Sequence, residues 1–140
     1  MLAKICVKPV ITASAQMTVA EAASTMRARN VGALVVVNAG RPVGILTDRD
    51  IVVEVVAQGK DPDVVRVADV MRKKPATIRD DLGILDAVKA FAKTGVRRLP
   101  VVAKSGLLVG VIAVDDLVML LGTELGHLAG GLSAGLRRAS

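Results

Sequence analysis

The chain has 140 residues, the size of one domain or of two small units that share a core, which argues against a large multidomain enzyme. Hydrophobic residues make up 52% of it but aromatic residues only 1%, so it lacks the rings on which single-stranded nucleic-acid binders stack bases. Nineteen Lys and Arg against thirteen Asp and Glu give a net charge of +6, which indicates a general attraction for anions.

Cysteine and histidine occur once each, as Cys6 and His127, so the sequence predicts no internal disulfide and no metal site. We therefore expect a reducing, cytoplasmic environment. The first ten residues have no long apolar segment, so we expect no signal peptide. The most apolar stretch, residues 107–121, is interrupted by Asp115 and Asp116 and is shorter than the roughly 20 residues of a membrane span. We expect no membrane segment.

The two halves of the chain repeat each other. A shift of 65 residues places Thr12 on Thr77, and a shift of 66 places Gly44 on Gly110 and Asp50 on Asp116. Each half is predicted to form a strand, a helix, two strands and a second helix. Because units of this size bury too little apolar area alone, we expect an α/β fold in which two β-α-β-β-α repeats pack about a pseudo-twofold axis.

The first repeat is predicted over residues 1–60. Its first helix begins at a capping box, because Thr18 is followed three residues later by Glu21. Two strands rich in β-branched residues follow, and Gly59 is expected to end the second helix. In chain order, the expected elements are a strand at 10–12, a helix with apolar positions from Val19 to Met26, strands at 33–37 and 43–46, and a helix at about 48–58.

Residues 61–69 are predicted to form a linker and residues 70–125 the second repeat. Its expected elements are a strand at 76–78, a helix with apolar positions from Ile84 to Phe91, strands at 99–102 and 108–113, and a helix at about 115–121. Residues 126–140 are rich in glycine, which disfavours helix. We expect a flexible C-terminal tail there rather than a short interaction helix.

The sharpest local signal is the segment 44–50, Gly-Ile-Leu-Thr-Asp-Arg-Asp, where a strand leads into a helix. The hydroxyl of Thr47 can donate to a phosphate, and the carboxylate of Asp50 can accept hydrogen bonds from a ribose diol. Thr47 with Asp50 is equally an ordinary capping pair, so both interpretations stay open for this segment. The second repeat keeps Asp116 but has Ala113 in place of the threonine, which capping alone explains less well.

A second signal is the arginine pair Arg97-Arg98 at the start of a predicted buried strand. Two arginines there are costly unless at least one meets a negative group. The first repeat has Gly32-Ala33 at the equivalent place, and residues 66–104 carry ten basic and four acidic groups, a surplus equal to that of the whole chain. These residues predict an anion site in the second half.

Together these motifs resemble the cystathionine β-synthase (CBS) domain pair, or Bateman module, over roughly residues 1–122. The matching segments are 47–51, 69–71 ahead of Pro75, 97–102 and 110–112. The resemblance implies a regulatory, non-enzymatic module that binds AMP, ADP or ATP, or alternatively S-adenosylmethionine or NAD(H), in clefts between the repeats. It implies no obligatory cofactor, a homodimer, and signalling to an effector protein in trans.

The resemblance also assigns residues to the two clefts. In the main cleft, Asp50 would hold the ribose, Thr47 would touch ribose or phosphate, and the arginine pair would face the phosphates. The residues assigned to it are Thr47, Asp50, Ile45, Leu46, Thr77, Arg97 and Arg98. A second, weaker cleft would use Thr12, Ile112 and Asp116.

Two further expectations come from charge and hydropathy. The basic segments 72–74 and 137–138 motivate an alternative function, a nucleic-acid-binding or structural interaction module. The segments 51–56 and 117–121 are apolar almost all round, which is more than one face of a short helix can bury in a module of this size. The latter pattern independently predicts a homodimer.

Overall fold

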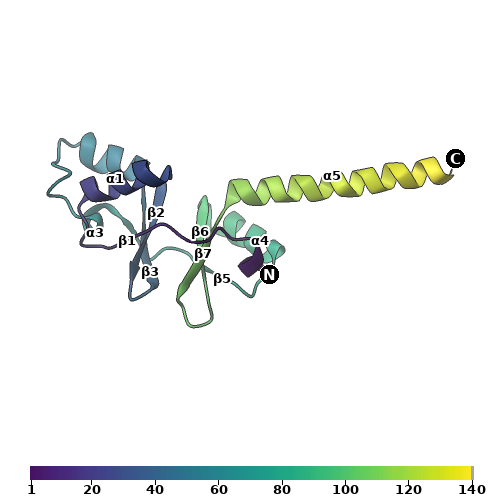
Figure 1. Ribbon diagram of the computed structural model, residues 1–140, viewed down its shortest axis with the longest axis horizontal. Helices are drawn as coiled ribbons and strands as arrows, with labels where there is room; N and C mark the ends of the chain where they lie inside the picture. Colours follow the sequence, from purple (N-terminus) through teal and green to yellow (C-terminus); the bar gives the residue numbers. More distant parts are fainter. Residues whose placement is uncertain (140) are drawn as a thin grey trace.

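The computed structural model describes residues 1–139, which form two α/β units that lie next to each other (Figure 1). The first unit contains β1 (Thr12–Ala13), α1 (Val19–Arg29), β2 (Ala33–Asn38), β3 (Arg41–Thr47), α2 (Asp48–Ile51), a π-helical turn η2 (Val52–Val56), α3 (Val67–Val70) and β4 (Arg72–Lys73). The second contains β5 (Ile78–Arg79), α4 (Ile84–Thr94), β6 (Arg98–Val102), β7 (Leu108–Ala113) and α5 (Val114–Ala139). A 3₁₀ turn η1 (Leu2–Lys4) precedes both. The predicted β-α-β-β-α order is confirmed in each unit.

The two sheets have the same construction. The first has the order β1-β2-β3-β4 and the second β5-β6-β7; in each, the first pair of strands is parallel and the next is antiparallel. Val36 pairs with Gly44, and Val101 pairs with Gly110. A register irregularity follows both valines at the equivalent step. The strand register therefore agrees with the repeat alignment read from the sequence.

The segments that precede the two units are exchanged between them. Leu2 is fully buried in the core of the second unit, and Val7 donates its N–H to the carbonyl of Val111 at 2.8 Å. In return, Val67 is fully buried in the first core, and β4 extends the first sheet by pairing with β3. The N-terminal segment leads into the first unit but packs on the second, and the segment around Val67 and β4 leads into the second unit but packs on the first. The packing therefore does not follow the repeat boundaries expected at residues 60 and 70.

The equivalence of these two segments extends to individual contacts. A Cβ atom added to Gly44 would lie 2.5 Å from the sulfur of Met71, and one added to Gly110 would lie 2.4 Å from the sulfur of Cys6. Both distances are too short for a side chain, so glycine is required where each returning segment crosses its strand. Cys6 and Met71 therefore occupy equivalent positions.

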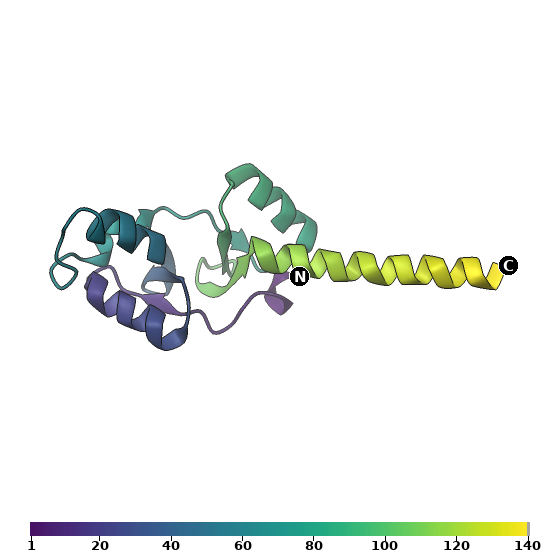
Figure 2. The same ribbon diagram turned by 90° about the horizontal axis from the view of Figure 1, so that it is seen from above.

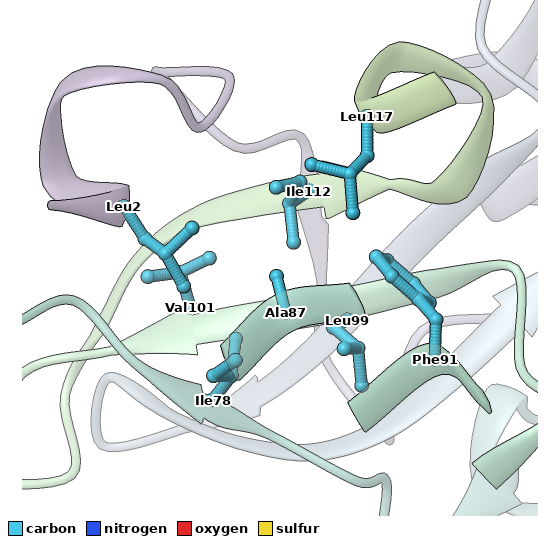
Figure 3. Close-up of a cluster of buried hydrophobic side chains, with 8 residues drawn as sticks. All are labelled: Leu2, Ile78, Ala87, Phe91, Leu99, Val101, Ile112 and Leu117. Atoms are coloured by element: carbon cyan, nitrogen blue, oxygen red, sulfur yellow. The ribbon is translucent and has the colours of Figure 1, made fainter. Parts of the chain in front are cut away.

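Each unit has its own apolar core between its sheet and helices. Figure 3 shows the second core, in which Leu2 from the N-terminus packs with residues of the second sheet, α4 and the start of α5. Its buried members are Leu2, Ile78, Ala87, Phe91, Leu99, Val101, Ile112 and Leu117. Those of the first core are Ala13, Ala22, Met26, Leu34, Val36, Leu46 and Val67. Apart from Phe91, both cores consist of aliphatic residues and methionine, as the composition requires.

The two units also touch at their β-hairpin turns. Leu108 donates its N–H to the carbonyl of Gly40 at 2.8 Å, and Arg41 Nη1 donates to the carbonyl of Ser105 at 2.5 Å. Gly40 and Gly106 have φ angles of +76° and +89°, which a glycine adopts without strain. The hairpin turns therefore add a contact between the two units beside that of the exchanged segments.

Helix boundaries confirm some expectations and correct others. Thr18 and Glu21 form the expected capping box of α1, with both hydrogen bonds at 3.2 Å. The helix expected at about 48–58 consists of the short α2 and the π-helical turn η2, which ends at Val56. Gly59 follows with a φ of +65°, and its N–H donates to the carbonyl of Val56 at 3.1 Å.

The prediction of a flexible tail over residues 126–140 is wrong for 126–139, because these residues continue α5 (Figures 1 and 2). The stretch contains no proline, and its four glycines, each costing about 1 kcal/mol relative to alanine, do not end the helix. Ser140 lies outside the described residues. By length and composition alone α5 could cross a membrane, and only 6% of its most apolar stretch is buried.

Candidate ligand-binding clefts

The larger cleft, of about 540 Å³, lies between the two units and has a volume typical of small-molecule sites. Its first wall is the turn from β3 into α2, its second is the segment that contains β4, and its third is the turn that leads into β6. The lining residues are Ile45, Thr47, Asp48, Arg49, Arg72, Lys73, Lys74, Pro75, Ala76, Gly95, Val96, Arg97 and Arg98.

This cleft is strongly positive. Six of its lining residues are basic and one is acidic. The basic ones are Arg49, Arg72, Lys73, Lys74, Arg97 and Arg98. A concave surface lined by charges of one sign concentrates counter-ions, so the arrangement favours a small ligand with several negative charges. Sequence reasoning missed Arg49 as a wall residue, and it interpreted 72–74 only as a nucleic-acid signal; the charge surplus of residues 66–104 was the clue.

Thr47 and Asp50 form a capping box at the start of α2. The Asp50 N–H donates to Thr47 Oγ1 at 3.1 Å, and the Thr47 N–H donates to Asp50 Oδ2 at 3.0 Å. Arg72 Nε donates to the other carboxylate oxygen of Asp50 at 3.4 Å. Asp50 is only 8% exposed and does not line the cleft, whereas Arg72 and Thr47 do. Thr47 and Asp50 thus form the capping pair that the sequence allowed. Asp50 contacts the cleft only indirectly, because Arg72, which lines the cleft, is bound to its carboxylate.

The two adjacent arginines have different surroundings. Arg97 Nη2 donates to Asp115 Oδ1 at 2.9 Å, in an exposed ion pair of the kind that contributes little to stability. Arg98 makes no side-chain hydrogen bond or ion pair within residues 1–139, and it lines both clefts. Its guanidinium is therefore available to an anion.

Besides Asp50, two more residues assigned to the main cleft do not line it. Leu46 is fully buried in the first core, because neighbouring residues of a strand point to opposite faces and Ile45 faces the cleft. Thr77 is exposed and does not line the cleft, whose wall ends at Ala76. Of the seven assigned residues, the structure brings together Ile45, Thr47, Arg97 and Arg98.

The smaller cleft, of about 360 Å³, is the pseudo-symmetric counterpart of the larger one and is mostly apolar. Val7, Pro9, Gly32 and Ala33 stand where the larger cleft has Arg72, Lys74, Arg97 and Arg98. Its charged lining residues are Arg98 and Asp116. Among the described residues the Asp116 carboxylate accepts no hydrogen bond, whereas the equivalent Asp50 carboxylate accepts from the Thr47 N–H and from Arg72.

The other two residues assigned to the smaller cleft do not line it. Ile112 is 3% exposed in the second core, and its neighbour Val111 lines the cleft instead. Thr12 is replaced on the wall by Ile11. The strand alternation that buries Leu46 thus accounts for Ile112 as well. Within residues 1–139, no group of three or more His, Cys, Asp and Glu side chains is placed to hold a metal ion.

Comparison with known sequences identifies both units. The CBS domain family model matches residues 2–57 and 67–123. An uncharacterised protein of Methanopyrus kandleri is 40% identical over 114 residues, which cover 81% of this chain and 58% of that protein. The CBS domain-containing protein YhcV of Bacillus subtilis is 40% identical over 110 residues, 79% of this chain and 77% of its own length. The chain thus spans little more than half of the first of these relatives.

Solved structures show the same arrangement. A CBS domain pair in complex with 5′-methylthioadenosine and S-adenosyl-L-methionine has a TM-score of 0.77 and 27% identity, and the match covers 89% of this chain and 97% of that one. A CBS domain protein from Pyrobaculum aerophilum complexed with AMP has a TM-score of 0.75 and 27% identity, covering 87% and 98%. A hexameric CBS-CP12 protein from bloom-forming cyanobacteria has a TM-score of 0.73 and 34% identity, covering 84% and 65%. The chain therefore belongs to the CBS domain family and contains two CBS repeats.

Proposed function

We propose that this protein is a regulatory, non-enzymatic cytoplasmic module that binds a phosphorylated adenosine ligand in the larger cleft and signals its occupancy to a partner protein in trans. The observation that carries the proposal is the set of six basic side chains around a cleft of nucleotide size. The AMP and S-adenosyl-L-methionine complexes of related CBS pairs support the adenosine part. The segment 72–74 contributes to this concave cleft, which supports a small anion over a nucleic acid.

The geometry suggests how such a ligand is held. The phosphates lie against Arg98 and the basic residues of segment 72–74, with the Thr47 hydroxyl as a further donor, since Thr47 Oγ1 acts only as an acceptor in its capping bond. Ile45 offers an apolar surface to the base. The ribose hydroxyls take over the Asp50 oxygen that Arg72 holds at 3.4 Å, which releases Arg72 toward the phosphates.

The smaller cleft takes a ligand with less charge. It has the Asp116 carboxylate for a ribose diol, but its only basic lining residue is Arg98, which it shares with the larger cleft. We propose that the smaller cleft binds a phosphorylated adenosine ligand more weakly than the larger cleft does. The residues equivalent to Arg72 and Arg97 are uncharged there, so the phosphates have no partner at those positions.

We also propose that the protein is a homodimer. Three valines of η2, Val52, Val53 and Val56, are 42–66% exposed on one short turn, which is a patch that a second copy can cover. Light scattering at micromolar concentration is expected to give a mass above that of one chain; a monomer would contradict the proposal.

The function is tested most directly by the ligand that copurifies with the protein, identified by mass spectrometry after denaturation. Thermal shifts with AMP, ADP, ATP, S-adenosylmethionine and NADH complement it, because a ligand at 100 times its Kd stabilises by about 2.7 kcal/mol. No shift with any of them would contradict the proposal. Tight DNA binding that falls steeply with salt would favour the nucleic-acid alternative instead.

Replacing Asp50 by asparagine is expected to lower the affinity for both AMP and adenosine by about tenfold, because the ribose that both ligands contain loses a charged hydrogen-bond acceptor. The amide oxygen retains the cap on Thr47, so the fold is kept. The matched control, Asp116→Asn, is expected to leave binding in the larger cleft almost unchanged. Isothermal titration calorimetry measures both. Loss of AMP binding in Asp116→Asn with retention in Asp50→Asn would reverse the assignment of the clefts.

A further inference from the structure

Arg98 lies between the two clefts and lines both of them. Its counterpart in the first repeat is Ala33, which lines the smaller cleft but not the larger. The difference follows from side-chain length, because alanine ends at Cβ whereas arginine carries its guanidinium at the end of a flexible alkyl stem. Arg98 is exposed, and no described residue holds its guanidinium by a hydrogen bond or ion pair. The guanidinium is therefore free to turn toward either cleft.

The smaller cleft depends on Arg98 for its positive charge. Within residues 1–139, its other charged lining residue is Asp116, whose carboxylate accepts no hydrogen bond. When Arg98 turns away, the smaller cleft presents a carboxylate and no cation to its ligand. A phosphate there meets a charge of its own sign, and the repulsion is stronger in a partly enclosed site than in bulk water. The hydroxyls of an uncharged nucleoside can still donate to Asp116.

The larger cleft has the advantage in the competition for Arg98. Five further basic residues line it, so it concentrates phosphorylated ligands more strongly than the smaller cleft does. Two of these five are already held by acids, Arg72 by Asp50 at 3.4 Å and Arg97 by Asp115 at 2.9 Å. Arg98 has no such contact to give up. A phosphate in the larger cleft therefore draws its guanidinium without breaking another interaction.

We propose that Arg98 couples the two clefts and sets the ligand class of the smaller one. A phosphorylated ligand in the larger cleft draws the guanidinium to itself, and the smaller cleft then accepts an adenosine compound without phosphate in preference to a second phosphorylated one. This coupling rests on the proposed function, since it requires a phosphorylated ligand in the larger cleft. Because coupling between two binding sites is reciprocal, a phosphate in the smaller cleft lowers the affinity of the larger cleft by the same factor.

The first test measures which ligands occupy the protein together. The unmodified chain is dialysed to equilibrium against equal concentrations of AMP and adenosine, and both ligands are counted after denaturation. We expect one AMP and one adenosine per chain, because AMP fills the larger cleft and leaves the smaller one without a cation. Two AMP per chain, or one AMP without adenosine, would overturn the proposal. A protein that binds no AMP would contradict the proposed function, and the coupling with it.

A weak second AMP by itself would also follow from two clefts of unequal affinity. The second test therefore compares the smaller cleft when the larger one is filled with AMP and when it is blocked. Lys73 is exposed, lines only the larger cleft and makes no side-chain hydrogen bond or ion pair within residues 1–139. Lys73→Trp places a bulky, uncharged side chain there, and this blocked variant is expected to bind one AMP per chain. A bulky maleimide attached to Lys73→Cys, made with Cys6→Ala, is a second way to block the larger cleft.

Isothermal titration calorimetry then gives the effect of Arg98→Ala in both states. With the larger cleft blocked, Arg98 serves the smaller cleft, so its removal is expected to lower the affinity for AMP by about tenfold. With the larger cleft filled, Arg98 is already engaged, and its removal is expected to leave the affinity for the second AMP almost unchanged. The matched control, Arg27→Ala, removes the same charge from α1 outside both clefts and is expected to change neither affinity.

Equal effects of Arg98→Ala in the blocked and the filled protein would show that Arg98 does not couple the clefts, and would overturn the proposal. So would a second AMP that binds the filled protein more tightly than AMP binds the blocked variant, because the guanidinium would then bridge two phosphates instead of serving one. In both of these cases AMP still binds the larger cleft, so the proposed function would stand without the coupling.

Discussion

Replacing Leu2 by alanine is expected to lower the free energy of unfolding by about 2–5 kcal/mol, although Leu2 is the second residue of the chain. Leu2 is fully buried and packs with Ile78, Leu99 and Val101 of the second unit (Figure 3). The N–H of Leu2 also donates to the carbonyl of Leu82 at 2.8 Å. Chemical denaturation measures the effect. The large cost is expected because the truncation leaves a cavity that the surrounding strands cannot close.

The matched control is Leu85→Ala, the same change on α4 at a side chain that is 72% exposed. Its effect is expected within about 0.5 kcal/mol. Equal stabilities for the two variants would mean that the N-terminal segment does not belong to the second core. The comparison therefore tests the segment exchange itself, with the chemical change held constant.

Replacing Arg98 by alanine is expected to lower the affinity for AMP by about tenfold or more, since a charge-assisted hydrogen bond contributes roughly 1.5–3 kcal/mol. Adenosine, which has no phosphate, is expected to bind almost as it does to the unmodified protein. The reason is that Arg98 lines the larger cleft with no side-chain partner among the described residues. Isothermal titration calorimetry with both ligands measures the difference.

Arg97→Ala serves as the control for this prediction. The Arg97 guanidinium is held by Asp115 at 2.9 Å, so we expect a smaller loss of AMP affinity than in Arg98→Ala. An Arg98→Ala variant that binds AMP normally, or that loses AMP and adenosine equally, would show that Arg98 does not hold the phosphate.

The sequence by itself was enough to predict the repeat and the order of helices and strands along the chain. The helical periodicity of Val19 to Met26 and of Ile84 to Phe91, each followed by β-branched strands with a glycine-containing turn, is a local pattern that occurs once in each repeat. The Thr18 capping box was likewise predictable, because its hydrogen bonds join residues three apart. Patterns of this kind depend only on residues a few positions apart in the chain, so they can be recognised without knowledge of the tertiary structure.

The clefts needed the tertiary structure. The resemblance assigned both Ile45 and Leu46 to the ligand, whereas the pleat of the strand sends them to opposite faces and only Ile45 reaches the cleft. The role of segment 72–74 depends on β4 pairing with β3, a contact between residues almost thirty positions apart. A surplus of basic residues in the sequence indicates that an anion binds, but it does not indicate which surface of the folded protein carries those residues.

The helix α5 and the exchanged segments show the same division. Glycine content predicted a flexible tail over residues 126–140, but the stretch contains no proline and the helix continues through Ala139. The burial of Leu2 in the second core was decided by packing between distant parts of the chain, since no local pattern at the N-terminus distinguishes one core from the other. Helix and strand propensities depend on residues close in the chain, so the sequence reveals them. Which distant segments pack together depends on the tertiary structure, so only the folded protein shows it.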